Sequence, residues 1–323
     1  MTRNKVRVFV TILIVFIVSI IILNKDQIFK KENKEPYQVS VICRSTSTES
    51  STSIKHGINQ AARDFNVDVS FITLMNENDS NEQISLLERE VKNGVDAVII
   101  TPANSEHLTK PIEEAQKSVP IIAMQSTVNT KKVLPYISSD NFELGNALAK
   151  EIVKNGENKR IAILRNSMEC SNIEKRHLGI LQGLNNTHNM IEYWDIPSDP
   201  QDAYQTAKRR LSTSSADTLI ALDGAVLEAA AKAEKDLINE GKRQVMIYGI
   251  GRTNSVVSLL EENIINSIGV ENEYNMGYLS IQTAVKTINK KSDARNISVN
   301  FAIVTPENMY DPENQRLLFP FVK

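Results

Sequence analysis

One segment, Asn93–Met124, constrains the fold of this chain more than any other. A β-branched run, Val98–Ile100, reaches Thr101 and Pro102, a polar loop and a helix-like stretch follow, and a second apolar run begins behind Pro120. This order predicts a strand–loop–helix–strand unit, because parallel strands in one sheet need such a crossover. Open sheets of this class bind small molecules in the loops beyond the carboxyl ends of their strands. The polar side chains of those loops are therefore the candidates for function.

Length, charge and cysteine usage exclude several classes of protein. The chain has 323 residues, enough for about two domains, and a net charge of −2. It therefore offers no basic surface for nucleic acid. Two cysteines, Cys43 and Cys170, are too few for a disulfide framework or a cysteine-held metal cluster. They are either buried small apolar residues or a pair that forms in an oxidising space.

The N-terminus carries an apolar run, Val8–Leu23, of sixteen residues without a charge. As a helix it spans about 24 Å, and the flanking Arg7 and Lys25 can snorkel to reach the bilayer surfaces. A cleaved signal peptide is the alternative, but no small-residue cleavage pattern follows the run. We expect a transmembrane anchor over residues 1–23, a polar linker over 24–36, and a body on the extracytoplasmic side of the cell membrane.

The rest of the chain alternates between strand-like and helix-like segments. The remaining predicted strands are Val39–Cys43, Val67–Leu74, Tyr136–Ser138, Arg160–Leu164, Met190–Trp194, Thr218–Leu222, Val245–Tyr248 and Ile265–Val270. The predicted helices are Ile54–Phe65, Glu82–Lys92, Phe142–Lys154, Ile173–Leu184, Ala203–Leu211, Ala225–Glu240 and Val256–Glu262. Such alternation is typical of parallel sheets covered on both faces. It predicts an α/β protein with two doubly wound parallel-sheet lobes, with a closed eight-stranded barrel as the alternative.

Several pieces of this series carry a family resemblance. They are GVDAVIITPANS, VPIIAMQS, YISSDNFELGNALAKEIV, TLIALDGAVLEAAAKA, VMIYGIGRT and VTPENM. In this order they resemble the ribose/galactose-type sugar-binding proteins, whose type I periplasmic binding fold also forms the effector domains of LacI-family repressors. The resemblance implies an N-terminal lobe over residues 37–139 and 272–301, and a C-terminal lobe over 140–271 and 302–323. It implies hinge crossings at Ser138–Asn141 and near Glu271. A repressor is excluded because a membrane segment stands where its DNA-binding helices would be.

The loop after the first strand is rich in hydroxyl groups. Arg44 precedes STSTESSTS, in which eight of nine residues carry a hydroxyl. Thr48, Ser50 and Ser51 are candidate ligand contacts at a helix N-terminus, and serine or threonine here also serves as a plain helix cap. Sugar-binding relatives carry aromatic residues in this loop, and Ser50 and Ser51 stand in their places.

The resemblance points to further ligand positions where this chain departs from the family. Relatives have Asp-Arg after the strand behind Pro120, where this chain has Gln125 and Ser126. A family arginine is replaced by Glu174, and Arg176 lies two positions on. A salt bridge of Arg176 with Glu174 or with a neighbouring helix is the alternative to a place in the cleft.

Three more candidates follow later strands. Asp223 fits a ligand position after TLIAL, Arg252 replaces a family aspartate, and Glu271 stands where a polar residue contacts ligand near a hinge. The set is polar and mixed in charge, which suits a small polar ligand such as a sugar or sugar derivative. The arginines would suit an acidic or phosphorylated one.

Signals for catalysis are weak. The four histidines lack metal-site spacing, and Gly249-Ile250-Gly251 lacks the third glycine of a dinucleotide site. We therefore expect no enzyme, no metal and no cofactor. The predicted function is an extracytoplasmic solute-binding protein that captures its ligand between two lobes for an ABC importer permease. The alternatives are a ligand-sensing partner of a membrane histidine kinase and a Rossmann-like enzyme.

Overall fold

The computed structural model describes residues 9, 11–16, 19, 35–45, 52–156, 158–185, 187–291 and 296–319. The chain divides into two compact units, Met1–Pro36 and Tyr37–Lys323, and both sheets lie in the second. Half of the apolar run of the predicted membrane anchor, residues 8–23, lies outside the described residues. Among the residues that are described, no helix has the length and apolar character that crossing a bilayer requires.

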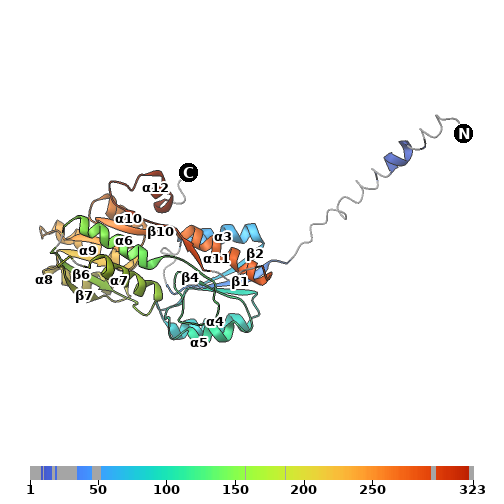
Figure 1. The fold of residues 1–323 in the computed structure, drawn as a ribbon, viewed down its shortest axis with the longest axis horizontal. Helices are drawn as coiled ribbons and strands as arrows, with labels where there is room; N and C mark the ends of the chain where they lie inside the picture. The colour runs from blue at the N-terminus through green and yellow to red at the C-terminus, as the bar shows by residue number, and fades with distance from the viewer. Residues whose placement is uncertain are drawn as a thin grey trace. The chain divides into compact units, whose positions relative to one another are not determined.

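The first lobe is built on a six-stranded parallel sheet. Its strands are β1 (Tyr37–Ile42), β2 (Val67–Ile72), β3 (Ala97–Ile100), β4 (Ile121–Met124), β5 (Tyr136–Ser139) and β11 (Ile297–Val299), in the order β11-β5-β4-β3-β1-β2. The helices α3 (Thr52–Phe65) and α11 (Glu273–Ile288) cover one face. The other face is covered by α4 (Ser80–Lys92) and α5 (Thr109–Ala115) (Figure 1).

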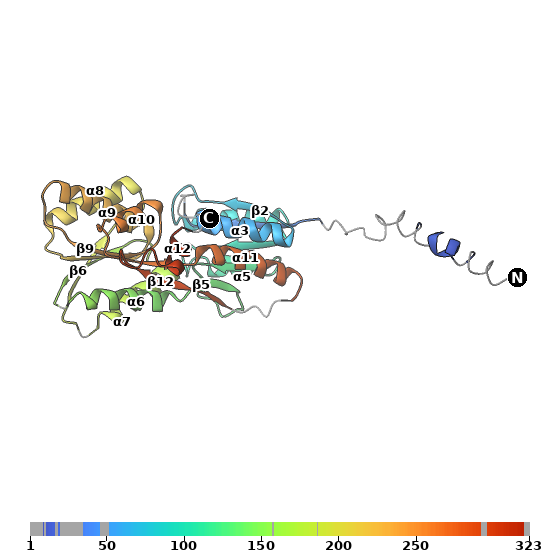
Figure 2. The ribbon, with the colours of Figure 1, turned by 90° about the horizontal axis from the view of Figure 1, so that it is seen from above.

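The second lobe repeats this plan around its own sheet. Its strands are β6 (Arg160–Arg165), β7 (Met190–Asp195), β8 (Thr218–Ala221), β9 (Met246–Ile250), β10 (Ser267–Glu271) and β12 (Phe301–Val304), in the order β12-β10-β9-β8-β6-β7. Strand β12 alone runs antiparallel to its neighbour. One face carries α6 (Asn141–Lys154) and α7 (Ser171–Gly183). The other carries α8 (Pro200–Thr213), α9 (Gly224–Asn239) and α10 (Asn254–Glu261), and α12 (Pro312–Leu318) packs beside β10 (Figure 2).

Aspartates begin several of the helices that follow strands or loops. The side chains of Asp79, Asp140, Asp199 and Asp223 each accept a hydrogen bond from backbone N–H groups of the first helical turn. Such caps satisfy donors that the helix itself leaves unpaired, and a carboxylate also suits the positive end of the helix dipole. The same caps place carboxylates beyond the carboxyl ends of parallel strands, where this class of fold binds ligands.

The observed elements confirm the two-lobe prediction and correct it in detail. Two separate six-stranded sheets rule out the closed barrel. The helix α11, the short strands β11 and β12, and α12 were not among the predicted elements. Cys43 and Cys170 are both buried free thiols, so the disulfide that the sequence left open is not formed.

The chain passes between the two lobes three times. It crosses from β5 to α6 at Ser139–Asn141, from β10 to α11 at Glu271–Glu273, and from β11 to β12 at 299–301. The first two crossings lie at the hinge positions that the family resemblance implied. Short crossings of this kind are where domain closure absorbs its changes in backbone angle.

Each lobe contains one pair of helices that touch backbone to backbone through glycines. In the first lobe, a Cβ on Gly57 of α3 would lie 1.9 Å from the Tyr274 carbonyl oxygen of α11. In the second lobe, a Cβ on Gly145 of α6 would lie 2.2 Å from the Arg176 carbonyl oxygen of α7, and Gly179 approaches α6 in the same way. These contacts admit no side chain, so the glycines set the distance between the paired helices.

We expect Gly145→Ala to destabilise the protein by about 1–3 kcal/mol, because its methyl group forces α6 and α7 apart. Urea unfolding of the variant measures the change. Gly224→Ala is the control, since a Cβ there meets its nearest atom at 3.5 Å and alanine favours a helix. Equal stabilities of the two variants would contradict the packing argument.

Candidate functional site

A cavity of about 740 Å³ lies between the lobes, at the carboxyl ends of their parallel strands. From the first lobe it is lined by Cys43, Arg44, Ser45, Ile54, Glu77 and Gln125. The lining residues from the second lobe and the crossings are Asn166, Asn172, Arg176, the loop residues Pro197–Asp199, the start of α8, Asp223, the first half of α9, Gly251–Thr253, Glu271 and Glu273. Its position matches the place where this fold class binds ligands.

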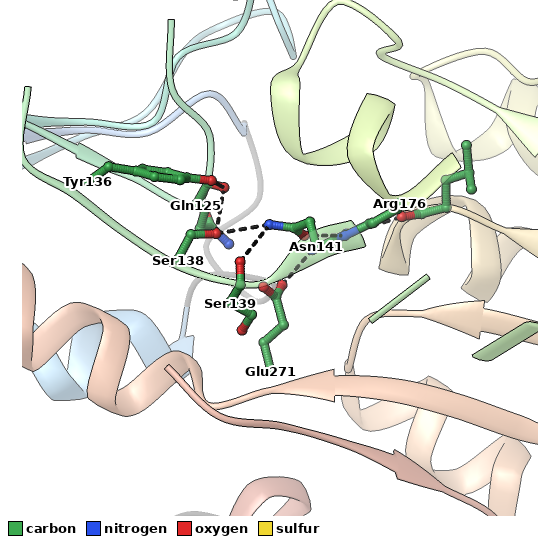
Figure 3. Close-up of polar contacts among 8 residues, drawn as sticks. Gln125, Tyr136, Ser138, Ser139, Asn141, Arg176 and Glu271 are labelled. Atoms are coloured by element: carbon green, nitrogen blue, oxygen red, sulfur yellow. Dashed lines mark hydrogen bonds and ion pairs between the residues drawn. The ribbon is translucent and has the colours of Figure 1, made fainter. Parts of the chain in front are cut away.

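Arg176 is a charged side chain of the cavity wall whose guanidinium makes three hydrogen bonds to the protein. Its Nη2 pairs with Glu271 Oε2 at 2.5 Å, its Nε donates to Asn141 Oδ1 at 2.8 Å, and its Nη1 donates to the Leu222 carbonyl oxygen at 3.0 Å. The residue is only 4% exposed. Asn141 lies on one crossing and Glu271 on another, so the guanidinium joins two crossings to the carboxyl end of β8 (Figure 3).

The hydrogen bonds continue from Asn141 into the first lobe. The Asn141 side-chain amide donates to Ser138 Oγ at 2.9 Å, and Ser138 Oγ donates to the Gln125 carbonyl oxygen at 3.0 Å. The Tyr136 hydroxyl donates to the same carbonyl at 2.8 Å. Gln125 has a left-handed backbone with φ of 61°, and this turn at the end of β4 sets the side chain in the cavity wall (Figure 3).

Two buried acceptor atoms in the cavity wall have no hydrogen-bond partner in the described structure. They are Glu271 Oε1 and Asn172 Oδ1. The Glu271 side chain is 8% exposed, and Asn172 is 2% exposed. Because buried polar atoms are almost always paired, two such acceptors on residues of one cavity wall would be satisfied by a ligand that donates hydrogen bonds.

Asp223 and Arg252 contribute charge from the second lobe. Asp223 caps α9, and its Oδ1 accepts from the Ala225 and Val226 N–H groups at 3.0 Å. Arg252 donates through Nε to the Leu318 carbonyl oxygen at 2.7 Å and through Nη1 to Ser53 Oγ at 3.0 Å. Burial lowers the pKa of the Arg252 guanidinium. Because Ser53 belongs to the first lobe, this second bond joins the lobes across the cleft.

Two carboxyl groups in the wall are held in surroundings that disfavour their charge. Burial, together with the nearby negative charge of Glu271, raises the pKa of Glu273 to about 8. Burial raises the pKa of Glu77 as well, and the Arg44 guanidinium offsets part of this effect. Arg44 itself donates to Asn78 Oδ1 at 2.7 Å, and Asn78 in turn donates to Ser167 Oγ of the second lobe at 2.6 Å.

The family model described as a periplasmic binding protein domain matches residues 39–292. The chain belongs to the periplasmic binding protein family. This membership agrees with the prediction that the chain is not an enzyme. It also agrees with the type I fold that the sequence resemblance implied.

Two curated relatives show the extent of the similarity. The ABC transporter periplasmic-binding protein YphF of Escherichia coli is 22% identical over 76% of this chain and 78% of its own length. The ribose import binding protein RbsB of Bacillus subtilis is 27% identical over 46% of this chain and 48% of its own length.

Solved structures of other binding proteins share the fold. The carbohydrate transporter solute binding protein of Agrobacterium radiobacter, in complex with D-arabinose, superposes with a TM-score of 0.81 at 23% identity. The match covers 88% of this chain and 99% of that one. An ABC transporter solute binding protein of Agrobacterium vitis with bound D-fucose gives 0.82 at 18% identity, over 87% and 100% of the two chains.

Most of the described candidate residues line the cavity of this periplasmic binding protein. Arg44, Gln125, Arg176, Asp223, Arg252 and Glu271 all line it. Thr48, Ser50 and Ser51 lie outside the described residues. Arg176 pairs with Glu271. It therefore does not form the alternative salt bridge with Glu174 or with a neighbouring helix that the sequence suggested.

Two candidates do not line the cavity. Ser126 is fully buried, with its Oγ 3.1 Å from Ser171 Oγ, so it joins the lobes beside the cavity. Glu174 is exposed, because α7 begins at Ser171 and turns position 176 inward and position 174 outward. The structure therefore places neither Ser126 nor Glu174 in the cavity wall where the sequence led us to expect them.

Sequence reasoning missed Glu77, Asn172 and Glu273 in the wall. Glu77 follows β2 in a loop, and Asn172 begins α7. Glu273 opens α11, two positions after Glu271. Each follows a strand in a parallel unit, which is the one signal that points to them, but many surface residues share that placement.

We expect Arg176→Met to lower the free energy of unfolding by about 3–5 kcal/mol, because it leaves the Glu271 carboxylate buried without its cation. Arg165→Met is the matched control. Arg165 pairs with Asp195, whose side chain is 81% exposed, and such surface pairs contribute about 1 kcal/mol or less. Urea unfolding measures both, and a small change in both variants would refute a structural role for Arg176.

The raised pKa of Glu273 predicts how stability depends on pH. Between its ordinary value of 4.5 and the folded value of about 8, the folded protein holds a proton that the unfolded chain has released. Stability from this group is therefore present at low pH and is lost as pH rises toward 8, by at most about 1.4 kcal/mol per pH unit. Glu273→Gln should flatten this decline. Identical slopes in urea unfolding of wild type and variant from about pH 5 to pH 8 would contradict it.

Proposed function

We propose that this chain is an extracytoplasmic solute-binding protein that captures a sugar or sugar derivative between its two lobes and delivers it to an ABC importer permease. The observation that carries the proposal is the cavity between the lobes, whose wall contains two buried acceptor atoms without partners in the described structure. A ligand that brings several hydroxyl donors satisfies such atoms. Reversible capture needs no further chemistry.

The relatives support the choice of ligand class. The name of one relative refers to ribose import, and the two solved structures hold D-arabinose and D-fucose. Among the described residues that line the cavity of this chain, Tyr204 is the one aromatic residue. Recognition would then rest on hydrogen bonds and charge more than on stacking of an aromatic ring against a sugar face.

The candidate residues have distinct proposed roles. Glu271 and Asn172 accept from ligand hydroxyls, Gln125 both donates and accepts, and Arg44 closes the cavity from the first lobe. Arg176 holds Glu271 in place, since its guanidinium donates to Asn141, to the Leu222 carbonyl oxygen and to Glu271 itself. Its role is positioning, and the free oxygen of Glu271 is what the ligand contacts.

The proposal includes a membrane anchor at residues 8–23. The support is the uncharged run Val8–Leu23 with basic flanks, together with membership in a family named for the periplasm. An anchor on the binding protein would keep it at the membrane surface, close to a permease.

Presentation of the closed form to a sensor histidine kinase is the alternative outcome of ligand capture. One structural neighbour is a complex, XylFII-LytSN, at 19% identity and a TM-score of 0.77. That likeness concerns the fold alone, and the curated relatives are named for transport and import. We therefore place delivery to a permease first.

Titration calorimetry of the purified chain with pentoses, hexoses and their derivatives tests the proposal. We expect saturable binding without turnover of one sugar class. Asn172→Leu should weaken it about tenfold or more, because a buried acceptor contact is lost. Gln116→Leu is the control, since Gln116 Oε1 is also buried without a partner among the described residues but lies outside the cavity. Absence of binding to every sugar would overturn the proposal.

A further inference from the structure

The cavity extends beyond the space between the lobes, along one face of α9. Ala225, Glu228, Ala229 and Lys232 all line it, and their spacing places them in one stripe on the helix. From the first to the last of them the helix rises about 10 Å, which is about two turns. A crossover helix runs back alongside the strand that precedes it, so this stripe leads from the strand ends into the second lobe.

The beginning of α8 forms the other side of this extension. The helices α8 and α9 lie side by side (Figure 2), and Pro200, Gln201, Ala203 and Tyr204 of α8 also line the cavity. We call the part of the cavity lined by these four residues and by the lining residues of α9 the helical groove. Every residue of the helical groove belongs to the second lobe.

The helical groove combines apolar and polar surfaces. Ala203, Val226 and Ala229 are buried apolar side chains of its wall. The Tyr204 hydroxyl donates to Asp236 Oδ2 at 2.5 Å, so the ring is what this residue offers to a ligand. Polar surface comes from Gln201, which is exposed and whose side-chain amide has no hydrogen-bond partner among the described residues.

The charged side chains of the helical groove are paired within the protein. Lys232 pairs with Glu228 Oε1 at 2.5 Å, and the other carboxylate oxygen of Glu228 accepts from Thr253 Oγ1 at 2.5 Å. An acidic or phosphorylated group in the groove would have to displace these contacts. The groove therefore favours an uncharged ligand with an apolar face and polar edges, and a sugar ring has both because its C–H groups form the faces and its hydroxyls the edge.

A monosaccharide is too short to occupy both parts of the cavity. With bonds of about 1.5 Å, a pyranose ring measures about 6 Å between its outermost oxygen atoms. The stripe on α9 alone is about 10 Å long, and the space between the lobes adds to it. The whole cavity, of about 740 Å³, falls among those that enclose drug-sized ligands.

We infer that the ligand is a neutral disaccharide, with one ring between the lobes at Asn172 and Glu271 and the second ring in the helical groove against Tyr204. This inference rests on the proposed function and narrows its ligand class. The first ring is recognised by hydrogen bonds between the lobes. The second ring contacts the second lobe alone, through the Tyr204 ring and the Gln201 amide.

Calorimetry on the full chain, in a detergent without a sugar headgroup, tests this with matched ligands. The disaccharides are maltose, cellobiose, lactose, melibiose and xylobiose, and the monosaccharides are glucose, galactose, xylose, ribose and arabinose. We expect at least one disaccharide to bind about tenfold more tightly than each of its component sugars, because its second ring adds contacts in the helical groove. Para-nitrophenyl glycosides of the same components carry an aryl group in place of the second ring.

Variants of Tyr204 locate the second ring. Tyr204→Leu should reduce the tenfold preference to about threefold or less and leave monosaccharide binding unchanged, whereas Tyr204→Phe keeps the ring and should keep the preference. Tyr310→Leu is the matched control, because the Tyr310 hydroxyl also donates to a carboxylate, that of Glu261, and the residue lies outside the cavity.

A second variant avoids the core of the lobe. Gln201 is exposed, so Gln201→Ala leaves the packing of α8 unchanged. It should weaken disaccharide binding about threefold and leave monosaccharide binding as it is, because the first ring does not reach the helical groove. This variant decides the question if Tyr204→Leu fails to fold.

The outcomes separate the two proposals. Monosaccharides that bind as tightly as every disaccharide would overturn the inference and leave the proposed function standing. An aryl glycoside that binds more tightly than every disaccharide would also overturn it, since the groove would then hold an apolar group. The same holds for a preference that survives both Tyr204→Leu and Gln201→Ala. Absence of binding to all sugars of the panel would overturn the proposed function, and the inference with it.

Discussion

The rest of the structure depends on the ion pair and hydrogen bonds that one buried arginine, Arg176, makes at the junction of the lobes. Arg176 bonds to Asn141 on one crossing, to Glu271 on another and to the end of β8. A cation this deeply buried is tolerable only when its donors are satisfied. The arrangement uses one oxygen of Glu271 and leaves the other without a partner in the described structure. The same contact therefore stabilises the hinge region and fixes the position of the proposed ligand acceptor.

Close backbone contacts between paired helices within each lobe hold that junction in position. The carbonyl oxygen of Arg176 lies against Gly145 of α6, and Gly179 of α7 lies against the Phe142 carbonyl. The backbone of α7 is thus fixed against the helix that begins at the crossing, and the Arg176 side chain reaches Asn141 from a defined place. The first lobe uses the same device, with Gly57 and Gly277 between α3 and α11, beside the crossing that carries Glu271 and Glu273.

The sequence contained enough information for the longer strands and for some residues at strand ends, such as Asp223, and too little for residues on helices. Asp223 directly follows a buried strand and begins a helix, so its place was predictable. Glu174 and Arg176 are two positions apart, about 200° around a helix, so only one of them can face inward, and the start of α7 decides which. The helix α11 went unpredicted because Gly277 weakens the helical pattern while allowing contact with α3. The pKa of Glu273 depends on burial by both lobes, which no local pattern records.

Contacts across the cleft link capture of a ligand to movement of the lobes. Glu77 and Asp223 come from different lobes, and the Arg44 guanidinium acts on both carboxylates, so the protein itself supplies the counter-charge for this pair. The bonds from Asn78 to Ser167 and from Arg252 to Ser53 join the lobes across the cleft. A ligand held between the lobes shifts the closure equilibrium only by its preference for the closed state, since only differential affinity can move such an equilibrium.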